Sequence, residues 1–134
     1  MKHLIYSLSI VLILAVSACH KDSSTVIPSF KATATLPGKW YVVGNMISSG
    51  GPMYFVPASG KDYVVFNNDG TLSGTAFPNY AYYTVKDTAS LNMTNADNVT
   101  YENYYYKISH DTLTLGPAGP LICIEGCAVI LVKD

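Results

Sequence analysis

The stretch YVVFNNDGTLSGT, residues 63–75, decides the fold class of this chain. Its two arms are rich in β-branched and aromatic residues, and Asn68-Asp69-Gly70 separates them. An Asp-Gly pair after such an arm is the strongest short-range signal of a β-hairpin, because both residues accept the backbone angles of a tight turn. We therefore expect one strand over Tyr63–Asn67 and a second over Thr71–Thr75.

A second hairpin is predicted over Tyr104–Ile108 and Thr112–Leu115, with its turn near Ser109-His110-Asp111. Both arms alternate with a period of two, which sends successive side chains to opposite faces of a strand. Leu113 and Leu115 are expected to point inward. On the first arm one face carries Tyr104, Tyr106 and Ile108, and the other carries Tyr105 and Lys107.

The rest of the chain from Leu36 onward repeats this pattern, with Gly, Asn, Asp or Pro about every eight to twelve residues. No segment shows a sustained helical period. Strands are expected near residues 39–47, 52–57, 61–68, 71–76, 80–86, 89–94, 99–109, 111–115 and 121–133. We predict an all-β domain, a small antiparallel up-and-down β-barrel of about eight strands, because closure removes exposed sheet edges. A β-sandwich is the alternative.

The charge pattern excludes one class of partner. The chain has eight basic residues, all of them lysines, and a net charge of −1. Nucleic-acid and phosphate sites depend on the bidentate arginine fork and on a basic field. We expect no nucleic acid among the partners.

The first eighteen residues have the composition of an export signal. Lys2 is followed by an apolar run from Leu4 to Val16 and by two small residues, Ser17 and Ala18. About thirteen apolar residues in a helix span roughly 20 Å, short of the ~30 Å hydrocarbon core. A permanent transmembrane helix is therefore not expected.

Val16-Ser17-Ala18-Cys19 resembles the lipobox of bacterial lipoproteins. The resemblance implies cleavage before Cys19 and a lipid anchor on the thiol of Cys19, with a secreted protein as the alternative. His20 stands where an Asp would favour retention at the inner membrane, so the outer membrane is the expected location, on its periplasmic face or at the cell surface. Residues 19–35 lack an apolar period and are expected to form a flexible tether, with the barrel domain over residues 36–134.

The chain has three cysteines, and lipidation of Cys19 would leave Cys123 and Cys127 to form a disulfide outside the cytoplasm. Such a bond needs alpha carbons within about 7 Å, whereas a straight strand would hold them roughly 13 Å apart. A turn must therefore lie between them if the bond exists. Two free thiols are the alternative.

Gly38-Lys39-Trp40 at the head of the first strand resembles the Gly-x-Trp signature of lipocalins. The two hairpins resemble those of the short lipocalin-like domains in lipoproteins of Bacteroidetes, and the resemblance spans roughly residues 36–134. It implies that Trp40 plugs one end of the barrel beneath a cation. In lipocalins that cation is an arginine; here Lys133 or Lys107 would take its place.

Tyrosine is abundant, with eleven residues. Packing and β propensity explain many of them, but tyrosine also offers apolar area with a polar tip for binding. An interior cup would use Tyr82, Tyr104 and Tyr106, with Trp40 as a further ligand-binding candidate. An exposed aromatic platform for a glycan or protein would instead use Tyr83, Tyr101 and Tyr105.

Catalytic machinery is not expected. His110 and Asp111 lie at a predicted turn, Glu102 and Glu125 stand apart, and no nucleophile, phosphate-loop or metal motif is present. We expect neither a cofactor nor a metal. Asp87-Thr88-Ala89 and Asp111-Thr112-Leu113 resemble the short O-glycosylation signal of Bacteroidetes.

Two functions remain after these exclusions. The first is a lipid-anchored envelope protein whose lipocalin-like domain binds a small apolar or amphipathic ligand. The alternative is a surface or periplasmic interaction protein that binds a protein or glycan through exposed aromatic side chains. A cavity lined by Tyr and Val would favour the first, and a packed interior with outward tyrosines would favour the second.

Overall fold

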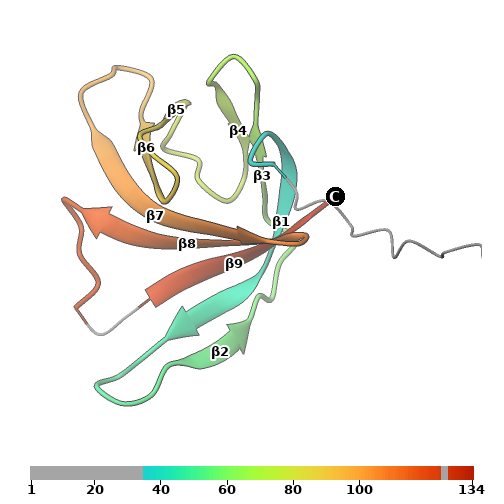
Figure 1. Ribbon diagram of the computed structural model, residues 1–134, viewed down its shortest axis with the longest axis vertical. Helices are drawn as coiled ribbons and strands as arrows, with labels where there is room; N and C mark the ends of the chain where they lie inside the picture. Colours follow the sequence, from blue (N-terminus) through green and yellow to red (C-terminus); the bar gives the residue numbers. More distant parts are fainter. Residues whose placement is uncertain (1–34, 125–126) are drawn as a thin grey trace, which may run out of the picture. The chain divides into compact units, whose positions relative to one another are not determined.

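The computed structural model describes residues 35–124 and 127–134, which lie in one compact unit, Lys31–Asp134. The predicted signal peptide, Cys19 and nearly all of the predicted tether lie outside the described residues. The strands within the described ranges are labelled in Figure 1. They are β1 (Gly38–Ile47), β2 (Tyr54–Pro57), β3 (Tyr63–Phe66), β4 (Leu72–Gly74), β5 (Tyr82–Val85), β6 (Ser90–Thr94), β7 (Tyr101–Ser109), β8 (Thr112–Gly119) and β9 (Cys127–Lys133).

All strands join one antiparallel sheet. Eight of them follow the order β4-β3-β1-β9-β8-β7-β6-β5, and β2 pairs with β1 beside that path. β3 pairs with Gly38–Tyr41 and β2 pairs with Gly44–Ile47, so both use the same edge of β1. They act as one interrupted strand, and in Figure 1 β2 lies beside the half of β1 that is remote from β3.

The two ends of this path approach each other at β4 and β5. Thr71 and Tyr82 form an antiparallel bridge. The Leu72 N–H donates to the Ala81 carbonyl and the Tyr83 N–H donates to the Gly70 carbonyl, each at 2.7 Å. These bonds nearly close the sheet into an eight-stranded barrel. The prediction of an all-β antiparallel barrel is confirmed, and the architecture is compatible with a lipocalin-like fold.

Both predicted hairpins form. β3 and β4 pair with Phe66 opposite Leu72, and Gly70 has a φ of 85°, which glycine adopts without cost. β7 and β8 pair with Ser109 opposite Thr112, and His110 between them has a φ of 54°. Local turn chemistry set both registers.

The barrel has two distinct ends. We call one the closed end; it holds the turns 67–71, 86–89 and 109–111 and residues 35–38 and 133–134. We call the other the open end; it holds the segments 48–53, 75–81, 95–100 and 120–124. The antiparallel path alternates between these two sets of connections.

The core fills the interior toward the closed end. Its buried side chains come from β1, β3, β4, β6, β8 and β9 and the segment before β1, and burying each large one contributes roughly 1.5–3 kcal/mol. They are Leu36, Trp40, Val64, Phe66, Leu72, Leu91, Met93, Leu113, Leu115 and Leu131. Leu113 and Leu115 point inward as predicted. Tyr104, Tyr106 and Ile108 pack against this core, whereas Tyr105 and Lys107 are exposed.

The last two strands differ from the expected ranges. β8 continues to Gly119 and β9 begins at Cys127, not near residue 121. Beyond Leu115, β8 pairs with β7 but no longer with β9, and such an edge accommodates Pro117, which lacks an N–H. Residues 120–124 therefore leave the sheet and form part of the open end.

Candidate ligand-binding site

A cavity of about 470 Å³ lies at the open end of the barrel. Its wall is mostly apolar and draws on five strands and on two of the loops beside them. The residues that border it are Asn45, Ile47, Val56, Phe77, Glu102, Tyr104, Pro117, Leu121, Cys127, Ala128 and Val129. The volume falls within the range of about 300–1,000 Å³ that is usual for small-molecule sites.

The course of β1 creates this space. Its register against β9 shifts between Val42 and Gly44, and such a bulge bends a strand. Beyond the bulge, Asn45 lies opposite Val129 and borders the cavity with it. On the outer side the Phe55 ring lies so close to Gly44 that a Cβ there would collide with it. The Phe55 ring of β2 thus covers Gly44 on the outer side, while Asn45 and Ile47 of β1 border the cavity.

Glu102 places a carboxylate in the wall of the cavity, and the residue is only 2% exposed. Its Oε1 accepts a hydrogen bond from the Gly119 N–H and its Oε2 accepts one from the Leu121 N–H, both at 3.1 Å. Backbone donors are the usual way to hold a buried carboxylate. These bonds also tie β7 to the start of the 120–124 loop.

Tyr104, two residues further along β7, borders the same cavity. Its ring meets that of Phe77 edge to face, with centroids 5.9 Å apart. Burial raises the pKa of the Tyr104 phenol above its usual value, and the neighbouring Tyr80 and Glu102 raise it further. A phenol carries its proton at neutral pH in any case, and the raised pKa extends this protonated state to higher pH.

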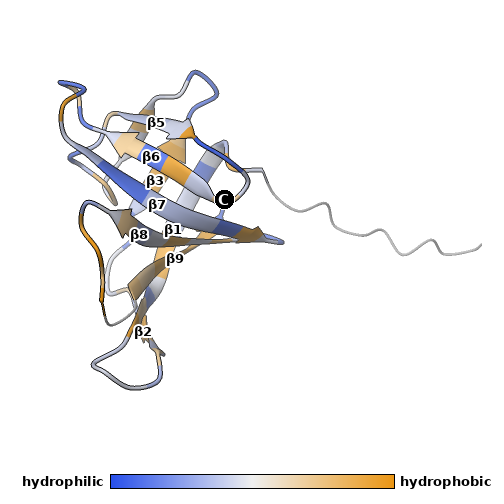
Figure 2. Cartoon of the chain, turned by 60° about the vertical axis from the view of Figure 1, so that its left-hand side comes forward, coloured by the Kyte–Doolittle hydropathy of each residue, from blue (hydrophilic) through white to orange (hydrophobic). Residues whose placement is uncertain are grey.

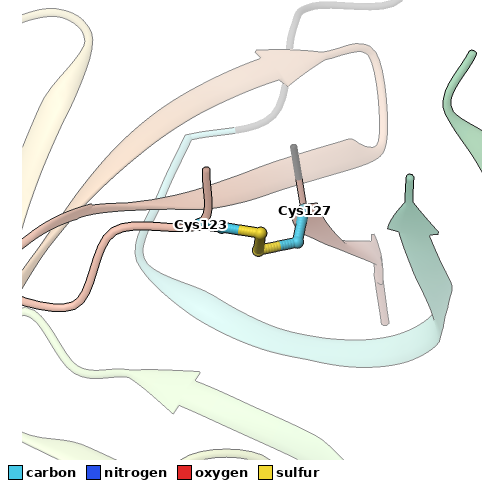
Figure 3. The surroundings of a disulfide bond; sticks show 2 residues. All are labelled: Cys123 and Cys127. Carbon is cyan, nitrogen blue, oxygen red and sulfur yellow. A yellow bond between two sulfur atoms is a disulfide. The ribbon is translucent and has the colours of Figure 1, made fainter. Parts of the chain in front are cut away.

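The predicted disulfide between Cys123 and Cys127 is confirmed (Figure 3). The two alpha carbons lie 5.9 Å apart, so the chain reverses here instead of running straight. Cys127 borders the cavity, and the bond fixes the 120–124 loop against β9. Figure 2 shows this loop in the hydrophobic colour. Its side chains Leu121, Ile122 and Ile124 are exposed, Ile124 to 94%.

At the closed end, Trp40 is fully buried, and its Nε1 donates to the Leu36 carbonyl at 2.7 Å. The Lys133 ammonium lies 4.7 Å from the centre of the Trp40 ring and donates to the carbonyls of Thr35 and Pro37. The predicted lysine over the plug is therefore Lys133 of the last strand, and Lys107 is exposed. Burial lowers the pKa of Lys133.

Of the predicted ligand-binding residues, Tyr104 alone borders the cavity. The placement of Tyr82 in an interior cup is wrong: Tyr82 is 41% exposed and Tyr83 turns inward, its ring 5.0 Å from that of Phe66. Tyr106 packs on the core and donates to the Asp87 carbonyl near the closed end. Trp40 belongs to the closed end and does not border the cavity.

The prediction that Tyr83, Tyr101 and Tyr105 form one exposed platform is wrong for Tyr83. Tyr101 and Tyr105 are exposed, but Tyr83 packs against the core. Tyr101 borders a polar groove on the outer face of β6 and β7, together with Lys86, Asn92, Thr94, Asn98 and Asn103. The Asn92 Nδ2 donates to Asn103 Oδ1 at 3.1 Å, so a row of amides lies beside an aromatic ring.

Sequence reasoning missed the part that Glu102 plays in this site. The signal was present, because Glu102 shares the period-two face of Tyr104, Tyr106 and Ile108. Parity along β7 alone places this carboxylate inside the barrel. Phe77 and Pro117 carried no comparable signal, because they lie in or beside connections whose course depends on the assembled sheet.

Neither a metal centre nor a spanning helix emerges from the described ranges. Residues 35–124 and 127–134 contain no group of three or more His, Cys, Asp or Glu side chains that could hold a metal ion. No helix in the same ranges is long and apolar enough to cross a membrane. Comparison with protein-family models and with curated proteins found no match to this chain.

Proposed function

We propose that this chain is a lipid-anchored envelope protein whose lipocalin-like barrel binds a small apolar or amphipathic molecule at its open end, without catalysing a reaction. The observation that carries the proposal is the 470 Å³ cavity with its mostly apolar wall. Binding of an apolar molecule in a water-accessible apolar cavity of this size is favourable, because apolar surface is removed from water. Val56, Val129 and Tyr104 in its wall are of the types expected for such a site.

The anchoring part of the proposal rests on the sequence. The apolar run over 4–16 and the lipobox-like Val16-Ser17-Ala18-Cys19 support export and acylation of Cys19. The disulfide between Cys123 and Cys127 is consistent with an oxidising compartment. The outer membrane is the proposed location.

Binding is tested with the Cys19→Ser chain, which cannot be acylated. The neutral fluorescent probe N-phenyl-1-naphthylamine should bind saturably and brighten in the cavity. Val56→Trp fills the mouth and should weaken binding by about tenfold or more, which is about 1.4 kcal/mol. Val99→Trp is the matched control, since Val99 is 76% exposed in a turn and does not border the cavity. Equal binding by both variants would remove the cavity as the site.

Anchoring is tested by fractionating cells that express the chain. The unsubstituted protein should enter the membrane fraction, and mass spectrometry should find acyl chains on an N-terminal Cys19. Cys19→Ser should carry no acyl chains. An unmodified Cys19 in the native protein, or an acylated Cys19→Ser chain, contradicts this part of the proposal.

A second candidate function is the binding of a glycan or protein on the outer face, favoured by the groove beside Tyr101. Amides next to an exposed aromatic ring suit sugar hydroxyls and the apolar face of a pyranose. The two candidates separate by variant: Val56→Trp should spare this groove, whereas Tyr101→Ser should spare the cavity.

A further inference from the structure

Among the residues that the structure describes, Glu102 is the one buried residue with a polar or charged side chain. A carboxylate offers about four acceptor positions, and the N–H groups of Gly119 and Leu121 occupy two of them. Acceptor capacity therefore remains at a group that borders the cavity.

Within residues 35–124 and 127–134, the wall of the cavity supplies no positive charge to this carboxylate. The lining residues in these ranges include neither Lys nor His, and the sequence has no arginine. A charge that is buried without a counter-charge costs free energy, and a bound cation that reaches it recovers part of that cost. Among the described residues, the site therefore has a negative charge without a positive partner, and a bound cation would supply that partner.

The neighbouring polar group does not change this balance. Tyr104 is protonated near neutral pH as any phenol is, and burial, Tyr80 and Glu102 raise its pKa further. It is neutral, so among the described residues of the wall only Glu102 carries a charge. The remaining wall includes Ile47, Val56, Phe77 and Val129, which suit an alkyl or aromatic body.

We infer that the open-end cavity selects amphiphiles with a cationic, hydrogen-donating head, which binds at Glu102 while the apolar body contacts the opposite wall. This inference rests on the proposed binding function and adds the chemical class of the ligand. Fatty acids and other anionic amphiphiles are disfavoured, because their carboxylate would face that of Glu102 in a wall of low polarity. Neutral alcohols of equal length fall between the two classes.

The test uses three straight-chain amphiphiles of equal length, decylamine, decanol and decanoate, in the Cys19→Ser chain near neutral pH. Each is titrated against bound N-phenyl-1-naphthylamine, below the concentration at which it forms micelles. Decylamine should displace the probe at a concentration about tenfold or more below that of decanoate. Decanol should require an intermediate concentration.

Glu102→Gln keeps the shape of the side chain and removes its charge. It should bring decylamine and decanoate within about threefold of each other, while the affinity for decanol changes little. Asp134→Asn is the matched control, because it removes one negative charge at the closed end and should leave the preference intact. Loss of the preference in Asp134→Asn would show that net charge alone produced it and would overturn the inference.

The outcomes separate this inference from the function on which it rests. Saturable binding of the probe and decanol without a preference for decylamine overturns the inference and leaves the binding function standing. Failure of every compound to bind overturns both. If Glu102→Gln does not fold, the order of the three compounds in the unsubstituted site still decides the sign of the preference.

Discussion

The Lys133 ammonium stabilises the closed end: it lies over the Trp40 ring and donates hydrogen bonds to two backbone carbonyls of the segment before β1. Lys133→Met keeps most of the apolar stem but removes the charge and its donors. We expect it to lower the free energy of unfolding by about 1–2 kcal/mol. Lys107→Met is the control, because Lys107 is exposed on β7, and it should change stability by less than about 0.5 kcal/mol. Urea unfolding measures both, and equal effects would contradict a special role for Lys133.

Tyr104 makes the stability of the domain depend on alkaline pH. Its pKa is raised above 10.0 in the folded state, so the unfolded chain loses this proton first as the pH rises. Its contribution is complete below the unfolded value, and stability is lost as pH rises through the interval up to the folded value. Tyr104→Phe should therefore flatten part of the fall in stability between about pH 9 and pH 11, as measured by urea unfolding. Parallel curves for the two proteins would contradict this. A residual fall is expected, because the pKa values of Tyr80 and Tyr83 are raised as well.

Glu102 shows which features of the site can be predicted from the sequence and which cannot. The period of two along β7 suffices to send Glu102 and Tyr104 inward. The partners of Glu102 lie 17 and 19 residues further on, at the end of β8 and in the loop after it, and their position depends on the paired sheet. Alternation therefore predicts the direction of the carboxylate but neither its hydrogen bonds nor the cavity beside it.

At the scale of elements, β3 and β4 require a glycine where the chain leaves the hairpin. Gly74 has a φ of 123°, and a Cβ at this position would collide with the Tyr63 carbonyl. Gly74→Ala should lower the free energy of unfolding by about 2–3 kcal/mol. Gly51→Ala is the control, because nothing lies within 4 Å of its would-be Cβ. It should stay within about 1 kcal/mol of the parent protein. Urea unfolding compares the two, and a tolerated Gly74→Ala would show that β4 can shift without cost.

The way the chain enters β5 explains why the prediction that Tyr82 faces the interior is wrong. Hairpins with tight turns, such as β3–β4 and β7–β8, fix their own register, so their faces follow from sequence. β5 is reached through residues 75–81, and its phase is set by two backbone bonds: the Leu72 N–H donates to the Ala81 carbonyl and the Tyr83 N–H donates to the Gly70 carbonyl. A shift of one residue exchanges the two faces of a strand. No local pattern distinguishes Tyr82 from Tyr83, and the inward place of Tyr83 became visible only in the assembled barrel.

At the scale of the whole molecule, the two ends of the barrel serve different purposes. The core, Trp40 and Lys133 occupy the closed end, whereas the cavity, Glu102 and the disulfide occupy the open end. Ile47 lies seven positions after Trp40 along β1, roughly 23 Å of extended strand. Side chains that far apart, without shared partners, are expected to contribute independently to stability.

This separation gives a quantitative expectation. The double variant Cys123→Ser with Cys127→Ser should lower the free energy of unfolding by about 2 kcal/mol, since the bond closes a short loop. It should also weaken binding of N-phenyl-1-naphthylamine, because Cys127 borders the cavity. Lys133→Met should lower stability without changing probe affinity. Combined, the two stability losses should add to within about 0.5 kcal/mol in urea unfolding. A several-fold loss of probe affinity in Lys133→Met, or a clear departure from additivity, would mean that the closed end controls the shape of the open one. Binding would then be a property of the whole barrel and not of its mouth.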